Sequence, residues 1–386
     1  MTRYLEGNRL VLLRSGAEYF PALEREIQGA SREIQLETYI YNGDGTGQRI
    51  TAALCEAARR GVQVRVLVDG FGSRDMPQEF RARFRHAGVR LLVYRPEISR
   101  FRFRRHRLRR LHRKLTVIDA RVAFIGGINI IDDMLEGAER IPPRYDYAVR
   151  IEGPLLRPIQ REAERLWGQV SWASLRRRWR PEPRIGVQPA PAGSQRAVLL
   201  VRDNIRHRSE IEDAYLDAVE AAREEIIIAN AYFFPGIRFR HALMRAAERG
   251  VRVVLLLQGR VEYLLLHYAS RALYGTLLEA GVEIHEYHQS FLHAKVAVID
   301  GHWATVGSSN IDPFSLMLAR EANVAVEDRA FAGELRASLH LALEGGAQYI
   351  LKNMWMHQPL LRRASIWLAY GFTRFLIGMV GYGGQH

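Results

Sequence analysis

The sequence predicts an α/β fold made of two copies of one unit, each a β-sheet with helices packed on both faces. Within each half, short apolar strand runs alternate with helical stretches such as ITAALCEAARR and FRHALMRAAER, a pattern typical of sheets covered by helices. Three stretches of the first half are repeated in the same order in the second. REIQLETYIYN (32–42) resembles REEIIIANAYFF (223–234), EAARRGVQVRVLVDG (56–70) resembles RAAERGVRVVLLLQG (245–259), and HAGVRLLVY (86–94) resembles EAGVEIHEY (279–287).

A proline-rich segment, PEPRIGVQPAPAGSQ (181–195), separates the two copies. Its four prolines and its lack of large apolar side chains are typical of a linker. We therefore expect four parts. They are an N-terminal domain (1–180), the linker (181–195), a C-terminal domain (196–350) and a basic, aromatic C-terminal segment (351–386).

One motif, H-x-K-x4-D-x6-G-[GS]-x-N, follows the repeated stretches in each copy. Its residues are His112, Lys114, Asp119, Gly126, Gly127 and Asn129 in the first copy, and His293, Lys295, Asp300, Gly307, Ser308 and Asn310 in the second. In an extended strand, positions i and i+2 point to the same face, so each histidine and its lysine are expected to project together. The motif is long, and its duplication argues against lone structural histidines.

Lysine is rare in this chain, and two of its three lysines, Lys114 and Lys295, occupy the motif. The third is Lys352, whereas the remaining 53 of the 56 basic residues are arginine. An ammonium is a compact charge with three donors, and a guanidinium is a planar fork, so a site shaped around an ammonium rejects arginine. The sequence therefore indicates that these two positions need an ammonium group.

Duplicated H-x-K-x4-D motifs, each followed by G-[GS]-x-N in an α/β half, resemble the phospholipase D superfamily. Within it, ALYGTLLEAGVEIHEYHQSFLHAKVAVID (272–300) resembles the bacterial cardiolipin synthases. The resemblance extends over nearly the whole chain. It implies two α/β/α sandwich domains, each with a mixed sheet, that share one active site at their interface.

The resemblance also implies a phosphoryl transfer through a covalent phosphohistidine. We expect His112 to be the nucleophile, by analogy with the family, and His293 to be the general acid and base. Lys114, Lys295, Asn129 and Asn310 are expected to stabilise the phosphate oxygens, so that no metal and no other cofactor is needed. The catalytic set is expected to be His112, Lys114, Asp119, His293, Lys295 and Asp300.

Carboxylates follow both motifs and can orient the imidazoles. Asp146 in YDYAVRIEGP and Glu321 in REANVAVED are the candidates, since a carboxylate that accepts from one ring N–H sets the tautomer of the other nitrogen. The motif aspartates Asp119 and Asp300 begin or precede tight turns. We therefore interpret them as supports of the site rather than as acid–base groups.

The net charge of +14 predicts an anionic partner. Nine arginines in residues 95–114 form either a solvated basic loop or a flap for anionic headgroups. The apolar run 364–380 contains Trp367, Tyr370, Phe372 and Phe375, and it suits either a membrane-interface helix or a helix that closes a core. The first residues lack an apolar run long enough for a signal peptide. We expect a peripheral protein on the cytoplasmic side of the bacterial inner membrane.

We expect the reaction to be cardiolipin synthesis, in which phosphatidylglycerol donates a phosphatidyl group to a second phosphatidylglycerol and glycerol leaves. Three alternatives remain open. They are a phospholipase D that uses water, a nucleic-acid phosphodiesterase that uses the basic charge for backbone contact, and a basic membrane scaffold. No recognisable nucleic-acid-binding module is present, so a nucleic-acid partner is not expected. The acceptor alcohol, the acyl preference and the oligomeric state cannot be deduced from the motifs.

Overall fold

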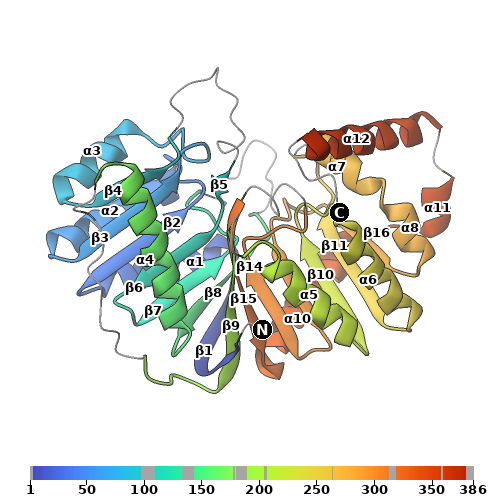
Figure 1. The fold of residues 1–386 in the computed structure, drawn as a ribbon, viewed down its shortest axis with the longest axis horizontal. Helices are drawn as coiled ribbons and strands as arrows, with labels where there is room; N and C mark the ends of the chain where they lie inside the picture. Colours follow the sequence, from blue (N-terminus) through green and yellow to red (C-terminus); the bar gives the residue numbers. More distant parts are fainter. Residues whose placement is uncertain are drawn as a thin grey trace.

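The two predicted copies form the two halves of one continuous mixed β-sheet, which lie side by side in Figure 1. The computed structural model describes residues 3–96, 109–132, 143–176, 179, 189–203, 207–262, 264–312, 319–357 and 360–379.

The first repeat contains the strands on one side of the sheet. Its elements are β1 (Leu5–Arg14), α1 (Ser15–Gln28), β2 (Glu33–Thr38), α2 (Gly45–Arg59), β3 (Gln63–Asp69), α3 (Gln78–Ala87), β4 (Arg90–Tyr94), β5 (Arg110–Leu111), β6 (Lys114–Ile118), β7 (Val122–Gly126), β8 (Tyr147–Glu152) and α4 (Leu156–Ala173).

The second repeat follows the same order and adds elements at its C-terminal end. Its elements are β9 (Gln195–Arg202), α5 (Glu210–Ala221), β10 (Glu225–Asn230), α6 (Ile237–Glu248), β11 (Arg252–Gln258), α7 (Leu264–Arg271), α8 (Tyr274–Glu279), β12 (Glu283–Tyr287), β13 (Lys295–Ile299), β14 (Trp303–Gly307), β15 (Ala319–Glu327), α10 (Arg329–Gly346), β16 (Ala347–Tyr349), α11 (Lys352–Met356) and α12 (Leu360–Met379).

The strand order shows that the two halves are copies. The first half runs β1-β8-β7-β6-β2-β3-β4 from the centre outwards, and the second runs β9-β15-β14-β13-β10-β11-β12-β16. In both halves the strand that begins at the motif lysine, β6 or β13, lies antiparallel between its neighbours. β1 pairs with β9 at the centre, so the halves share one sheet.

Helices cover the outer faces of the sheet, and a common core fills the space between the two halves. α1, α2 and α3 pack on the outer face of the first half, and α5, α6, α7 and α8 pack on that of the second. The central core combines apolar residues of both half-sheets with residues of α4 and α10. The predicted fold class, duplicated α/β domains with helices on both faces of a mixed sheet, is confirmed.

The predicted linker lies between α4, which ends at Ala173, and β9, which begins at Gln195, and residues 181–188 lie outside the described residues. The proposed domain boundaries stay predictions. Among the described residues, no helix combines the length and the apolar character that crossing a membrane requires.

Candidate active site

Each motif histidine lies two residues before the first residue of β6 or β13. Backbone hydrogen bonds hold each of them to the opposite repeat. The N–H groups of His112 and Arg113 donate to the carbonyl of Arg320, at 3.0 and 2.8 Å. In the mirror arrangement, His293 N–H donates to the carbonyl of Tyr145 at 2.9 Å. Each histidine segment therefore runs beside the segment that leads into the carboxylate of the other repeat.

This exchange pairs each histidine with a carboxylate from the other half. His112 Nδ1 lies 2.9 Å from Oε1 and 3.2 Å from Oε2 of Glu321, and His293 Nδ1 lies 2.6 Å from Oδ2 of Asp146. Because an ionised carboxylate only accepts hydrogen bonds, Nδ1 carries the proton in each ring. Nε2 of each imidazole then keeps a lone pair for chemistry.

The two motif lysines are buried between these pairs. Lys114 Nζ donates to the carbonyl oxygen of His112 at 2.6 Å, and Lys295 Nζ donates to that of His293. Burial lowers the pKa of Lys114 to about 7 and that of Lys295 to about 8, although Glu321 and Asp146 oppose the shift. A bound phosphodiester would add negative charge and favour the protonated form of both lysines.

The electrostatic surroundings of the two motif histidines overlap. Burial lowers the pKa of His112, and the positive charges of Lys114 and Lys295 lower it further, while Glu321 opposes them. The pKa of His293 is lowered well below its ordinary value by burial, then by Lys295, Arg144, Lys114 and His112. Each ring thus feels charges from both repeats, and each is still partly exposed, with 18% of the His112 side chain and 11% of the His293 side chain accessible.

Asp146 is held close to the backbone by a glycine of the motif. Its Oδ1 accepts the N–H of Tyr147 at 2.8 Å, and a Cβ placed on Gly127 would lie 2.3 Å from that oxygen. Burial raises the pKa of Asp146 to about 6, so the carboxyl is mostly ionised at neutral pH. Any side chain at Gly127 would push the carboxylate away from His293.

Glu321 is held by a hydroxyl at the equivalent position of the second motif. Ser308 Oγ donates to Glu321 Oε2 at 2.5 Å, and the N–H of Ala322 donates back to Ser308 Oγ at 3.1 Å. The glutamate side chain is one methylene longer than aspartate, which leaves room for the serine. The second position of G-[GS] therefore contacts the carboxylate in each copy, as Gly127 beside Asp146 and as Ser308 beside Glu321.

The two motif asparagines are buried at the same end of the sheet as the histidines. Asn129 Oδ1 accepts the N–H of Ile40 at 3.1 Å, so its amide nitrogen is the group that it can offer to a phosphate. Asn310 follows Ser309 and is 3% exposed.

Asp119 and Asp300 lie outside this group, and we remove them from the candidate catalytic set. Each follows the far end of the five-residue strand that starts at the motif lysine. Asp119 accepts the N–H groups of Ser31, Arg32 and Glu33, each at 2.8 Å. Asp300 accepts the N–H groups of Arg223, Glu224 and Glu225, at 2.8, 2.8 and 2.9 Å. Both carboxylates therefore anchor the start of the neighbouring strand, β2 or β10.

Sequence reasoning missed three neighbours of the site. The Tyr39 ring lies edge-on to His112, with 4.9 Å between ring centroids, and Lys114 Nζ lies 5.6 Å from the same ring centroid. Arg144 lies close enough to lower the pKa of His293, and Ser308 was part of the motif without a role. The duplication could not reveal Tyr39, because Ala231 occupies the corresponding position of the second repeat.

The predicted basic segment, residues 95–114, falls largely outside the described residues. Residues 97–108 are not described, so its role as a flap for headgroups stays a prediction.

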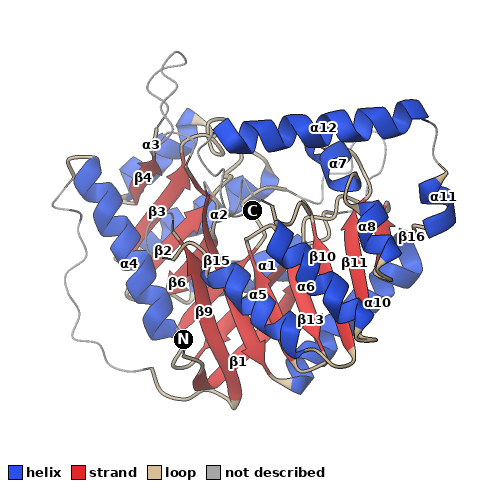
Figure 2. Ribbon diagram, turned by 45° about the vertical axis from the view of Figure 1, so that its right-hand side comes forward, coloured by secondary structure: helices blue, strands red, loops and turns tan. Residues whose placement is uncertain are grey.

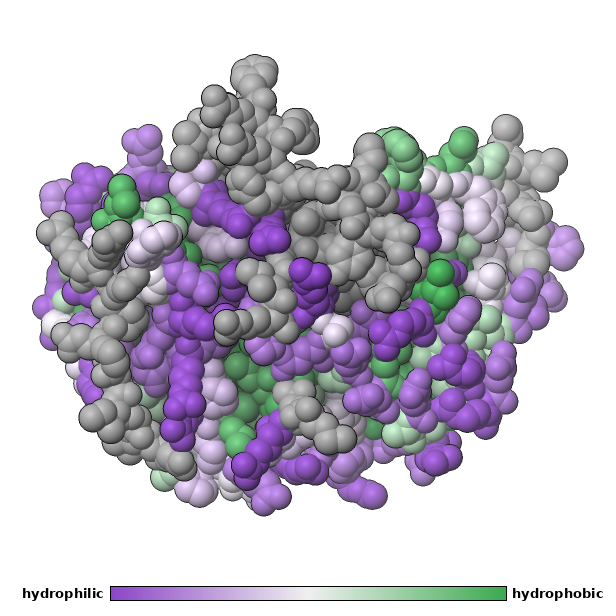
Figure 3. All heavy atoms as spheres, in the orientation of Figure 1, coloured by the Kyte–Doolittle hydropathy of each residue, from purple (hydrophilic) through white to green (hydrophobic). Residues whose placement is uncertain are grey.

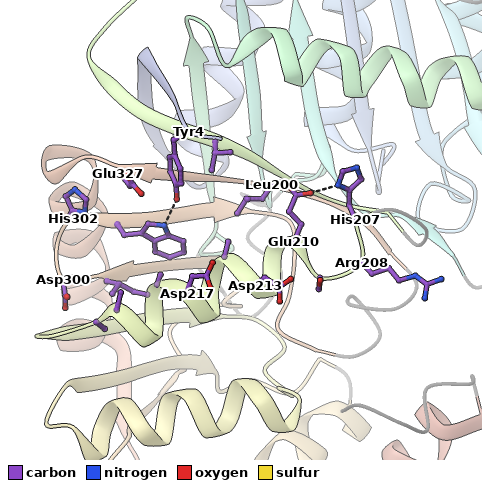
Figure 4. Close-up of a pocket in the computed structure, with 18 residues that line it drawn as sticks. Tyr4, Leu200, His207, Arg208, Glu210, Asp213, Asp217, Asp300, His302 and Glu327 are labelled. Carbon is purple, nitrogen blue, oxygen red and sulfur yellow. Dashed lines mark hydrogen bonds and ion pairs between the residues drawn. The ribbon is translucent and has the colours of Figure 1, made fainter. Parts of the chain in front are cut away.

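A cavity of about 750 Å³ lies elsewhere, under α5 in the second repeat (Figure 4). Trp303 Nε1 donates to Tyr4 Oη at 3.0 Å in its wall, and His207 Nδ1 lies 2.7 Å from Glu210 at its rim. Asp300 is the only motif residue that lines it. Its described lining contains no motif histidine or lysine, so it is separate from the site formed by the two motifs.

Comparison with known families identifies the class of protein. A family model described as "Cardiolipin synthase, PLD-like domain" matches residues 23–167 and 215–341, which include both histidine segments. The chain belongs to this phospholipase D-like family.

Individual relatives show which members of the family the chain resembles. The chain is 43% identical to cardiolipin synthase B of Escherichia coli K12 and 40% identical to cardiolipin synthase B of Salmonella typhi, in each case over 98% of this chain and 90% of the relative. The crystal structure of a phosphatidylserine synthase from Haemophilus influenzae Rd KW20 superposes with a TM-score of 0.73 over 98% of this chain and 96% of that chain. Its 14% identity supports the fold alone. The predicted superfamily and the predicted cardiolipin synthase branch are both confirmed.

Proposed function

We propose that this protein is a cardiolipin synthase, a phosphatidyltransferase that converts two phosphatidylglycerol molecules into cardiolipin and glycerol. The observation that carries the proposal is the pair of histidines, each oriented by a carboxylate of the other repeat beside two buried lysines. Such a site can split one difficult phosphoryl transfer into two easier ones. The 43% identity to a cardiolipin synthase supports phospholipid as the substrate class.

In the first step, Nε2 of His112 attacks the phosphorus of a bound phosphatidylglycerol. A P–N bond forms and the P–O bond to the terminal glycerol breaks. His293, which takes up a second proton on Nε2 when the anionic phosphodiester binds, donates that proton to the departing alkoxide and regains its Nε2 lone pair. Glycerol leaves, and the phosphatidyl group stays on His112. The role of nucleophile is given to His112 by similarity to the family.

In the second step, His293 removes a proton from the free hydroxyl of a second phosphatidylglycerol. The alkoxide attacks phosphorus, the P–N bond breaks, and cardiolipin is released with His112 restored. Lys114, Lys295 and the amide groups of Asn129 and Asn310 stabilise the charge on the non-bridging oxygens in both steps. Glu321 and Asp146 keep each Nδ1 protonated and each Nε2 facing phosphorus.

The partners follow from this reaction. They are phosphatidylglycerol, the anionic membrane surface that contains it, and glycerol as the second product, and no nucleic acid is expected. The high net positive charge favours binding to an acidic leaflet. We place the enzyme peripherally on the cytoplasmic side of the bacterial inner membrane.

The test is a product analysis of the purified protein with phosphatidylglycerol vesicles. We expect cardiolipin and glycerol in equal amounts, quantified by mass spectrometry. Phosphatidic acid as the sole phospholipid product would make the protein a hydrolase. Unchanged lipid together with cleavage of an oligonucleotide in a parallel reaction would overturn the lipid assignment.

A further inference from the structure

The last helix, α12, has one face that packs on the second repeat and one that faces solvent. Ile366 and Thr373 are buried, and the Tyr370 ring packs on the Phe234 ring with 5.6 Å between centroids. α12 also lies along α7, and Figure 2 shows it across one end of the molecule. The helix is therefore a docked part of the fold, and only its outer face is available to a partner.

The outer face of α12 is largely apolar, with the exposed Ser365 at its edge. Its large side chains are Trp367, Leu368, Phe372 and Phe375, which are 56%, 74%, 53% and 60% exposed. These positions, with Ala364 and Gly371 between them, follow the helical repeat and contain no charged residue. Figure 3 shows hydrophobic residues at the surface over this end of the second repeat. An exposed apolar strip of this kind marks a surface that binds something.

The buried face connects α12 to the candidate active site. Phe234, on which Tyr370 packs, donates its N–H to the carbonyl of Ile311 at 2.8 Å, and Ile311 directly follows the motif residue Asn310. The helix also lies at the same end of the sheet as β5, which leads into His112 (Figure 1). Whatever the outer face binds is therefore held at the end of the molecule that carries β5 and the motif residue Asn310.

We propose that this outer face of α12, formed by Trp367, Leu368, Phe372 and Phe375, docks the protein on an anionic lipid bilayer. This inference rests on the phospholipid substrate of the proposed function. The aromatic rings and leucine would enter the region between headgroups and acyl chains, where tryptophan and phenylalanine bind well. The positive charge of the chain would add attraction to the anionic headgroups. A phospholipid could then reach the histidines with its acyl chains still in the membrane.

The experiment compares wild-type protein with a Leu368→Gln/Phe372→Gln/Phe375→Gln variant, in which glutamine preserves helix propensity. Leu341→Gln is the matched control, because Leu341 is equally exposed but lies on α10. Binding is measured by sedimentation with vesicles of phosphatidylglycerol and phosphatidylcholine. Turnover is measured on the same vesicles and on a short-chain phosphatidylglycerol dissolved as monomers.

We expect the triple variant to lose at least tenfold in vesicle binding and in vesicle turnover, and to stay within twofold on the monomeric lipid. The control variant should match wild type in all three. Unchanged vesicle binding would overturn the proposal, and so would an equal loss on both substrates, which would make the face a support of the active site. A wild-type dimer that becomes monomeric in the triple variant would show that a second copy covers the face. If no protein makes cardiolipin, the proposed function fails, while the binding measurement still decides this inference.

Trp367 provides a direct readout of the contact. Brominated lipids should quench part of the protein fluorescence on vesicle binding, and Trp367→Phe should remove that part without preventing binding. Quenching that persists in Trp367→Phe would place another tryptophan at the membrane and would contradict docking through this face.

Discussion

The two histidine environments have the same plan but different supporting residues. Around His293, the short Asp146 sits against the backbone of Gly127, where no side chain fits. Around His112, the longer Glu321 is met by the hydroxyl of Ser308. The two sites therefore differ in both members of a contacting pair. Aspartate lies against glycine beside His293, and glutamate lies against serine beside His112.

A second difference lies on the other face of the same strands. Arg113, between the first motif histidine and lysine, is buried with its guanidinium 2.5 Å from Glu37 and 2.8 Å from Glu162. Ala294 and Ala229 occupy the positions of Arg113 and Glu37 in the second repeat. The duplicated core therefore tolerates either a buried ion pair or small apolar residues, whereas the histidine and lysine positions are identical in both copies.

The largest expected effect comes from removing either histidine, and it tests whether the two histidines have different roles. His112→Ala and His293→Ala should each lower cardiolipin formation by about three orders of magnitude or more, since each removes a reacting group. A phosphodiester with a nitrophenolate leaving group needs no general acid. It should restore covalent labelling of the protein in His293→Ala but not in His112→Ala, as measured by intact-protein mass spectrometry. The reverse pattern would exchange the two roles.

The next effect tests the exchange of carboxylates between repeats. Asp146→Asn and Glu321→Gln should each lower kcat by about two to three orders of magnitude, because an amide can stabilise the wrong imidazole tautomer. Nitrogen NMR of the histidine rings should show a changed tautomer at His293 in Asp146→Asn and at His112 in Glu321→Gln. A change at the histidine of the same repeat would contradict the pairing.

The lowered pKa values of the two motif lysines predict that phosphate affinity depends on pH. Since the pKa of Lys114 is about 7 and that of Lys295 about 8 in the free protein, both lose protons as the pH rises from 7 to 9. Affinity for a non-reactive phosphatidylglycerol analogue should therefore fall by at least about tenfold across this range, because the phosphate binds the protonated forms. Binding at pH 8 should take up protons, which calorimetry in two buffers measures. The exposed Lys352 is the control, and Lys352→Met should leave the profile unchanged.

The smallest effect concerns the serine that replaces Gly127 in the second motif. Ser308→Ala should lower kcat about three- to tenfold, the equivalent of one hydrogen bond of about 0.5–1.5 kcal/mol. Ser309→Ala is the neighbouring control, since the Ser309 hydroxyl makes no described contact with Glu321. Equal effects in the two variants would mean that Ser308 does not position the carboxylate.

Local patterns in the sequence predicted the duplicated fold and the motif side chains that the structure brings together. Strand alternation and fixed spacing encode where Lys114 and Lys295 start their strands. They could not predict that Glu321 serves His112, because 209 residues separate the two and the pairing depends on how the repeats dock. They placed Asp119 in the expected catalytic set but interpreted it as a support of the site, and its carboxylate accepts backbone N–H groups at the start of β2, in agreement with a supporting role. The run 364–380 suited either a core helix or an interface helix, and α12 has one buried face and one exposed, largely apolar face.

The exchange of carboxylates has a consequence for how such a site could diversify. A homodimer of one repeat could form the same crossed arrangement, but both of its histidines would have identical surroundings, because one sequence would encode both. In a single chain the two copies can change independently. Tyr39 corresponds to Ala231, Ser308 to Gly127 and Glu321 to Asp146, and at each of these equivalent positions the copies have diverged. Under the proposed mechanism, fusion of the repeats lets one imidazole specialise in bond formation and the other in proton transfer.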